Sequence, residues 1–364
     1  QLNKMIKTRI NKKILLLFLA GIFLLGCNTT TSNNSNNKDV TFTGTDGITA
    51  EFAANAPAKT VFENSYFPIL IRIRNQGAYS IPKDPADMQG LITIGREKDY
   101  VPILEIKEES RLAKSSGPSD NEMTFFIDGR SQINPNGDEL VASLKAKTSK
   151  LDAQSERRIS TITANLCYPY KTVLSTTVCI DPDIEGIRPG KKVCKVAAQP
   201  FANGQGAPLA ITKVESSMLP DTDNNVIKPQ FIIYIENKGR GNPVNLAGFR
   251  NACRNDFDVN DPINNRWNVA TLSAFTADNT GKVQLVCCPN RLGYCPDNDK
   301  DPVNIDNFAG FIRLKDNKDF VRCTFRNGIP KGFDAYTSPL SVEIDYGYVQ
   351  TISTNFIIQK PLKY

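Results

Sequence analysis

Hydrophobic and polar residues alternate over short stretches of this chain, and residues 67–74 show the pattern most clearly. Isoleucine occupies positions 69, 71 and 73, with leucine or arginine between them. Because side chains alternate between the two faces of a strand, this segment is predicted to be a strand with one buried and one mostly solvated face. Asn75-Gln76-Gly77 follows and is expected to form a tight turn, since Asn and Gly tolerate the left-handed backbone.

The same arrangement returns about 160 residues later. Phe231, Ile233 and Ile235 alternate with other residues and are followed by Asn237-Lys238-Gly239. Two such copies at domain-sized spacing predict two related immunoglobulin-like β-sandwich domains in tandem. The alternative is that hairpin endings converge on Asn-x-Gly without any repeat.

Further apolar runs are separated by Gly, Pro, Asn and Asp, which is typical of an all-β chain. The other predicted strands are residues 140–147, 158–168, 310–314, 339–346 and 348–359. The last two flank Gly347, which is expected to turn a terminal hairpin.

Residues 181–207 are rich in Pro, Gly, Lys and Gln and mark the best domain boundary. The expected organisation is a leader over residues 1–26, a tether over 27–38, a first sandwich over 39–182, a connector over 183–207 and a second, disulfide-rich sandwich over 208–364. Within the connector, Gly186 to Lys192 only resembles a phosphate loop. It has one residue too few between its glycines and lacks the Ser or Thr that binds magnesium.

Leu24-Leu25-Gly26-Cys27 resembles a lipobox at the end of an export signal. Five basic residues precede an apolar run over 14–26. Thirteen helical residues at about 1.5 Å each cannot cross about 30 Å of hydrocarbon. We therefore expect cleavage before Cys27, lipidation of its sulfur and anchoring at the outer face of the cytoplasmic membrane. Leu25 departs from the usual small or β-branched residue. The alternatives are an ordinary secretory leader with an incidental cysteine, or a poor transmembrane anchor.

Residues 28–38 contain only Asn, Thr, Ser and one Lys before Asp39, so we expect a flexible tether. Asn28 and Asn33 lie in Asn-x-Ser/Thr glycosylation signals. The leader supplies five of the six net positive charges, which leaves the exported part near neutral. A nucleic-acid partner is thereby excluded, because binding would need a basic surface.

An even number of cysteines beyond Cys27 predicts disulfides in an exported protein. They are Cys167, Cys179, Cys194, Cys253, Cys287, Cys288, Cys295 and Cys323. A zinc site is disfavoured because the chain has no Cys-x-x-Cys pair and no histidine. At least one bridge must cross the domain boundary. The simplest pairing joins Cys167 to Cys179 and ties Cys194 to the second domain, while Cys287 and Cys288 take different partners.

The absence of histidine excludes Ser-His-Asp, Cys-His and imidazole–metal chemistry. The sequence shows no catalytic constellation, and a non-enzyme is expected. Two runs of alternating oxygen side chains could bind calcium, although neither fits an EF-hand and solvated turns are the favoured reading. These runs are Asp256, Asp258, Asn260 and Asp261, and Asp297, Asp299 and Asp301.

The only tryptophan, Trp267, stands beside Arg266 and could be an exposed contact residue, but a core anchor is the preferred interpretation. Tyr336, Tyr346 and Tyr348 have the same ambiguity, since tyrosine is common at sandwich edges.

Several stretches resemble a family of uncharacterised archaeal surface lipoproteins with CARDB-like, immunoglobulin-like domains. The residues that carry this likeness are 42–47, 75–79, 167–172, 179–182 and 204–208, of which Cys167-Tyr168-Pro169-Tyr170 is the most specific. The resemblance implies an archaeal envelope protein with two β-sandwiches and brings no assigned activity.

The expected function is a non-enzymatic envelope protein for adhesion, protein contact or assembly, with a membrane lipid anchor and a protein or glycan partner at the cell surface. Self-assembly would be one form of such contact. The alternative is a binding module that captures a sugar or peptide, although such lipoproteins usually have long helical patterns that are scarce here. An envelope hydrolase with paired carboxylates is a third, less favoured reading.

Overall fold

The protein is described by a computed structural model over residues 40–115, 120–256, 267–278, 281–289, 311–325 and 327–361. Contacts join Asp39–Tyr364 into one compact unit. The described residues are mostly strand, so the all-β prediction is confirmed. Their helical segments are short: α2 (Phe249–Arg254), η1 (Val40–Phe42), η2 (Ala86–Met88) and η3 (Leu246–Gly248).

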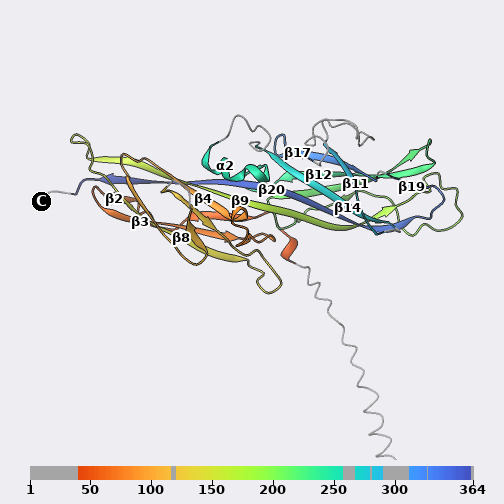
Figure 1. Ribbon diagram of the computed structural model, residues 1–364, viewed down its shortest axis with the longest axis horizontal. Helices are drawn as coiled ribbons and strands as arrows, with labels where there is room; N and C mark the ends of the chain where they lie inside the picture. Colours follow the sequence, from red (N-terminus) through yellow and green to blue (C-terminus); the bar gives the residue numbers. More distant parts are fainter. Residues whose placement is uncertain are drawn as a thin grey trace, which may run out of the picture. The chain divides into compact units, whose positions relative to one another are not determined.

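Two long strands form the spine of this unit (Figure 1). β9 (Arg157–Ile180) and β20 (Tyr336–Gln359) each contain 24 residues and pair antiparallel over their whole length. At about 3.4 Å per residue, each strand is about 80 Å long. All the other sheets are arranged around this pair.

The spine belongs to a ten-stranded sheet in which different strands flank its two halves. β4 pairs with the first half of β9, and β14 pairs with the first half of β20. The flanking strands are β2 (Thr60–Phe62), β4 (Gly90–Arg96), β6 (Leu112–Lys114), β7 (Glu122–Phe125), β13 (Asn242–Val244), β14 (Val269–Asp278), β15 (Gly281–Gln284) and β17 (Phe311–Arg313).

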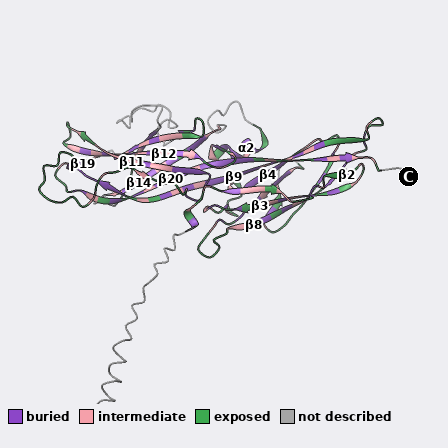
Figure 2. Cartoon of the chain, turned by 180° about the vertical axis from the view of Figure 1, so that it is seen from behind, coloured by how far each residue is buried: buried purple, intermediate pink, exposed green. Residues whose placement is uncertain are grey.

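Two smaller sheets cover one face of the spine. The first has the order β1-β3-β8-β5, and the second has the order β10-β11-β12-β18-β16, with β19 beside β12. Their strands are β1 (Ile48–Phe52), β3 (Tyr66–Asn75), β5 (Ile103–Lys107), β8 (Asp138–Lys147), β10 (Gln199–Pro200), β11 (Leu209–Asp221), β12 (Val226–Asn237), β16 (Val286–Pro289), β18 (Lys318–Thr324) and β19 (Ile329–Pro330). Their inward side chains form one continuous hydrophobic core with the spine. Figure 2 shows the buried residues along these strands.

The strongest sequence patterns correspond to strands of these smaller sheets. Ile69, Ile71 and Ile73 are buried in β3, and Ile233 and Ile235 are buried in β12. The predicted strands at residues 140–147 and 310–314 correspond to β8 and β17. Residues 158–168, predicted as a complete strand, are only the first half of β9.

The predicted terminal hairpin at Gly347 is wrong, because residues 336–359 form a single strand. Gly347 is needed for a close approach rather than for a turn. A Cβ atom at this position would lie 2.4 Å from Cβ of Phe249 and 2.9 Å from a methyl group of Val244. The glycine therefore lets helix α2 and strand β13 pack directly against the spine.

The last strand completes the sheet of the first half of the chain, since Gln359 pairs with Arg157 and Thr351 pairs with Asn165. Residues 181–198 contain neither helix nor strand, as expected for a connector. The assignment of 39–182 and 208–364 as separate immunoglobulin-like domains stays a prediction.

We predict that Gly347→Ala lowers the free energy of unfolding by about 1–3 kcal/mol, because the added methyl group overlaps Phe249 and Val244. Gly332→Ala is the matched control, since its Cβ would meet only Arg188 Nη2 at 3.9 Å. Urea unfolding of both variants measures the difference. Equal stability of the two variants would contradict the close-packing role of Gly347.

Candidate functional site

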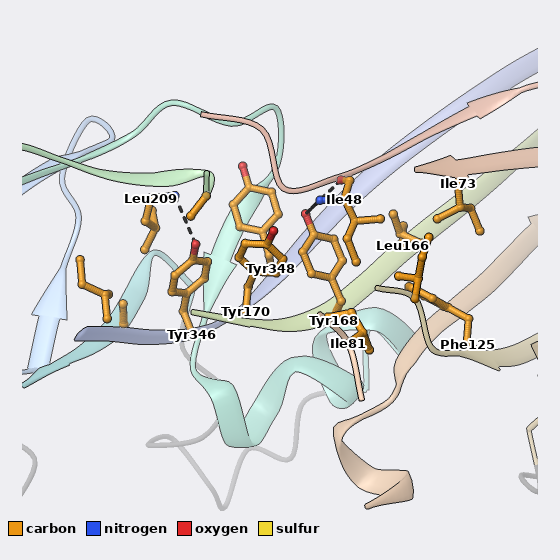
Figure 3. Close-up of a cluster of buried hydrophobic side chains, with 14 of the residues drawn as sticks. Ile48, Ile73, Ile81, Phe125, Leu166, Tyr168, Tyr170, Leu209, Tyr346 and Tyr348 are labelled. Carbon is orange, nitrogen blue, oxygen red and sulfur yellow. Dashed lines mark hydrogen bonds between the residues drawn. The ribbon is translucent and has the colours of Figure 1, made fainter. Parts of the chain in front are cut away.

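Four tyrosines lie side by side at the centre of the spine and form the tyrosine cluster: Tyr168, Tyr170, Tyr346 and Tyr348 (Figure 3). Tyr168 is paired with Tyr348 across the two strands, and Tyr170 is paired with Tyr346. Neighbouring rings have centroids 5.5 to 6.2 Å apart. All four side chains therefore point to one face of the long sheet and are buried there.

The first tyrosine of each strand fastens one of the smaller sheets. The hydroxyl of Tyr168 accepts a hydrogen bond from Ile48 N at 3.2 Å and donates one to Ile48 O at 3.1 Å. The hydroxyl of Tyr346 accepts from Leu209 N at 3.4 Å and contacts Thr172 Oγ1 at 3.1 Å. Ile48 begins β1 and Leu209 begins β11, so the two smaller sheets are held in corresponding ways.

The second tyrosine of each strand binds an Asn-x-Gly motif. Tyr170 donates to Asn75 Oδ1 at 3.2 Å, and Tyr348 donates to Asn237 Oδ1 at 3.1 Å. Each Asn also accepts a 3.2 Å bond from the N–H two residues later. Each Asn Nδ2 donates to the carbonyl four residues later, at 2.7 Å for Asn75 and 2.8 Å for Asn237. The two motifs are thus duplicated in their contacts as well as in sequence.

The expected left-handed backbone in these motifs is wrong, because neither Asn75 nor Gly77 has a positive φ. The glycines are required by space. A Cβ atom on Gly77 would lie 1.9 Å from the hydroxyl oxygen of Tyr170, and one on Gly239 would lie 2.3 Å from that of Tyr348. Asn-x-Gly is here a docking motif for a buried tyrosine.

Sequence reasoning missed this site, although it carries a signal. The sequence contains two Tyr-x-Tyr segments, Tyr168-Pro169-Tyr170 and Tyr346-Gly347-Tyr348. The number of residues that separates them resembles the number that separates the two Asn-x-Gly motifs. Of the tyrosines that the sequence left ambiguous, Tyr346 and Tyr348 are buried in the core. Tyr336 is partly buried at the start of β20.

Burial raises the pKa of every hydroxyl in the tyrosine cluster. The pKa values of Tyr168 and Tyr346 lie well above the usual value of 10.0, and burial likewise raises that of Tyr170. Burial raises the pKa of Tyr348 to about 12. The folded protein therefore holds these side chains in their neutral form, as donors to buried acceptors.

Helix α2 covers the opposite face of the spine, and its contacts form the α2 clamp. The Cys167–Cys253 disulfide joins it to β9. Arg254 donates two hydrogen bonds through Nε and one through Nη2, at 2.9 to 3.1 Å, to the buried carboxylate of Glu122 on β7. Thr93 Oγ1 and Asn165 Nδ2 both donate to Cys253 O, at 3.0 and 3.3 Å. A segment from the second half of the chain is thus bound to strands of the first half.

Trp267 belongs to the same region. It forms a β-bridge with Val244 and packs, partly buried, against the apolar side chains beneath α2. These contacts favour the interpretation of Trp267 as a packing anchor over that of an exposed contact residue.

The disulfides correct the simplest predicted pairing. Cys167 and Cys179 both lie in β9, twelve residues or about 40 Å apart, far beyond the reach of a disulfide. Cys167 pairs with Cys253, Cys179 with Cys194, and Cys287 with Cys323. The predicted tie of Cys194 to the second domain is wrong, because Cys194 pairs with Cys179. The bridge that joins residues on either side of the connector is instead Cys167–Cys253. Cys287 and Cys288 do take different partners, since Cys288 is also disulfide-bonded.

Most residues of the other predicted sites lie outside the described residues. These are Cys27, Asn28, Asn33, Asp258, Asn260, Asp261, Cys295, Asp297, Asp299 and Asp301. Asp256 is described and follows helix α2. Within the described ranges, His, Cys, Asp and Glu side chains do not gather into a group of three that could hold a metal ion. The calcium sites stay predictions.

Two grooves mark the surface of the described residues. The connector groove, of about 460 Å³, lies between β9 and the connector and is lined by Phe42, Val173–Ser175 and residues 200–205. The β5 groove, of about 480 Å³, is lined by residues 66–68, 105–107 and 143–145. At its rim, Lys145 Nζ lies 4.1 Å and Lys147 Nζ lies 5.2 Å from the ring centroid of Tyr66.

In the described part of the chain, no helix is long and apolar enough to span a membrane. Comparisons with known proteins add little. No protein-family model matches the chain, and no curated protein matches it.

Two solved structures align over most of the chain with very low similarity. The C-terminal domain of the Streptococcus agalactiae AgI/II polypeptide BspA has 7% identity and a TM-score of 0.19, covering 86% of this chain and 100% of that one. The C-terminal domain of the Streptococcus pyogenes antigen I/II-family protein AspA has 8% identity and a TM-score of 0.19, covering 87% and 100%. Similarity this low supports no conclusion about fold or function.

The tyrosine cluster predicts a loss of stability at alkaline pH. Unfolded tyrosines ionise near pH 10, whereas the folded cluster has raised pKa values. Stability should therefore be fully present below about pH 10 and fall as the pH rises through the folded values. Thermal melting from pH 8 to 12, followed together with tyrosinate absorbance, measures this. Ionisation of all tyrosines near pH 10 without unfolding would contradict the burial of the cluster.

Proposed function

We propose that this protein is a non-enzymatic, lipid-anchored component of the cell envelope that makes protein contacts at the cell surface. The observation that carries the proposal is the presence of several disulfides, among them Cys167–Cys253, Cys179–Cys194 and Cys287–Cys323, combined with the lipobox-like sequence before Cys27. Disulfides of this kind persist in oxidising compartments outside the cytosol.

The chemistry of the buried groups supports a structural role. The raised pKa values of the tyrosine cluster come mainly from burial. Its hydroxyls bond to backbone groups and Asn side chains of the two smaller sheets, and to Thr172 of β9. The buried carboxylate of Glu122 is bound by Arg254 in the α2 clamp. These groups fasten one part of the protein to another, which suits a rigid spacer or scaffold.

A binding module that captures a sugar or peptide is the second candidate. The connector groove favours it, because this groove is lined by Phe42, Phe201 and Leu174 together with polar Asn203 and Gln205. Ligand pockets commonly combine apolar walls with a few polar groups. Its volume of about 460 Å³ fits a small ligand rather than a folded partner.

Fractionation of cells that produce the full chain, followed by mass spectrometry, tests the anchor. We expect the protein in the membrane fraction with a lipid-modified Cys27, because two acyl chains suffice for stable attachment. Cys27→Ser should release it from the membrane, whereas the neighbouring control Thr29→Ser should leave it attached. A soluble wild-type chain with an unmodified Cys27 would refute the anchor.

Crosslinking before extraction separates the two candidate functions. Crosslinks to envelope proteins or to other copies of the chain are expected for a contact or scaffold protein. Crosslinks concentrated on one transporter would instead favour the binding module.

A further inference from the structure

One edge of the spine is left open between two short strands. On the side of β20 that faces away from β9, β13 pairs with residues 347–349 and β2 pairs with residues 357–359. Within the described part of the chain, residues 350–356 have no strand partner on that side. We call these seven residues the β20 gap.

The backbone groups of the odd-numbered residues in the β20 gap point away from β9. Ile357 N donates to Lys59 O, and Gln359 O accepts from Glu63 N, so the odd-numbered residues direct their N–H and C=O groups away from β9. Thr351, Ser353 and Asn355 therefore present three donors and three acceptors on this edge. All three residues are exposed, and among the described residues these groups have no backbone partner.

The β20 gap lacks the features that normally protect an edge strand. Edges are usually blocked by charged side chains, proline or bulges. Residues 350–356 read Gln-Thr-Ile-Ser-Thr-Asn-Phe, with no charge and no proline. By contrast, the edge strand β5 carries exposed Glu105 and Lys107. An added strand would therefore meet no charged side chain and no proline of residues 350–356.

The two faces of the β20 gap differ in polarity. On the outer face, Thr351 Oγ1 donates to Asn165 Oδ1 and Thr161 Oγ1 donates to Asn355 Oδ1, both at 2.8 Å. On the inner face, Ile352 is partly buried against the core and Phe356 is buried in it. Successive side chains of an added strand point to opposite faces. They would therefore lie in turn beside the polar, uncharged outer face and beside the apolar inner face.

The corresponding edge of β9, on the side that faces away from β20, is partly covered by the connector. By the equivalence of Tyr168 with Tyr346, Val173–Ser175 correspond to residues 351–353, and Thr177 corresponds to Asn355. Gln199 Nε2 donates to Thr177 O at 2.7 Å, and residues 200–205 line the groove above Val173–Ser175. The connector thus partly covers one copy of this edge.

A second copy of β20 does not fit the β20 gap. A long strand would have to continue through the positions that β13 and β2 occupy at the two ends. The open stretch is about 20 Å long, at about 3.4 Å per residue. Only a short extended segment can pair with this stretch, and the partner chain must turn away from the sheet before β13 and before β2.

We propose that the β20 gap binds a short extended segment of a partner protein, about five uncharged residues with alternating polar and apolar side chains, as an added β-strand. Up to six backbone hydrogen bonds with Thr351, Ser353 and Asn355 supply the affinity, and the alternating side chains supply the register. This site locates the protein contact of the proposed function. It does not require the lipid anchor, so either idea can fail without the other.

The test uses the purified, detergent-extracted full chain and the peptide acetyl-Lys-Thr-Val-Thr-Val-Thr-Lys-amide, with lysines only at its ends for solubility. Hydrogen exchange followed by mass spectrometry should show peptide-dependent protection over residues 350–356. Ser353→Pro removes an outward N–H without removing a bond to β9, and should weaken binding about tenfold or more. Ser175→Pro, at the corresponding covered edge, should bind like the wild type.

Three results would overturn the proposal: no protection of residues 350–356 at millimolar peptide, protection at residues 173–177 instead, or self-association that Ser353→Pro abolishes while the peptide does not bind. If Ser353→Pro does not fold, a peptide N-methylated on the valines and another N-methylated on the threonines replace the variant. In an added strand only alternate residues direct their N–H groups toward β20. One of the two methylated peptides should therefore bind much more weakly than the other. Equal binding of both would contradict it.

Discussion

The antiparallel pairing of β9 with β20 is the constraint on which the rest of the structure depends. Tyr168 and Tyr170 face Tyr348 and Tyr346 at its centre, and their hydroxyls fasten β1 and β11 at the start of the two smaller sheets. An unsatisfied buried hydroxyl would cost about 1–3 kcal/mol. Because one cluster supplies the bonds for both sheets, displacing either sheet leaves such groups without partners. The α2 clamp secures the same central region from the opposite face through Cys167–Cys253 and Arg254.

The sequence predicted the elements whose pattern is local. Alternating isoleucines identified β3 and β12, and the even cysteine count together with the expectation of export predicted disulfides. It failed where a distant contact decides the structure. Gly347 looks like a turn residue until Phe249 is placed against it, and Cys167 looks close to Cys179 until both lie in one extended strand. The docking role of Asn75 and Asn237 likewise depends on tyrosines far away in the sequence, which periodicity cannot reveal.

The duplicated contacts also explain why the two halves need not behave alike. Equivalent positions on β9 and β20 share their tyrosines and their edges, but the connector crosses only one edge, at Thr177. The opposite edge, at Thr351 to Asn355, remains open to solvent in the described structure. The tyrosine hydrogen bonds at the centre are thus duplicated, whereas the outer edges of β9 and β20 differ. The candidate contact surface therefore lies on a long paired strand.

The central claim is that the tyrosine cluster and the shared strands make residues 39–364 a single cooperative unit. Differential scanning calorimetry of the oxidised protein at neutral pH tests this claim most directly, with the fluorescence of Trp267 as a second probe beneath helix α2. The account predicts one transition, with equal calorimetric and van't Hoff enthalpies and a coincident fluorescence change. Two separate transitions, one for each half of the chain, would contradict it.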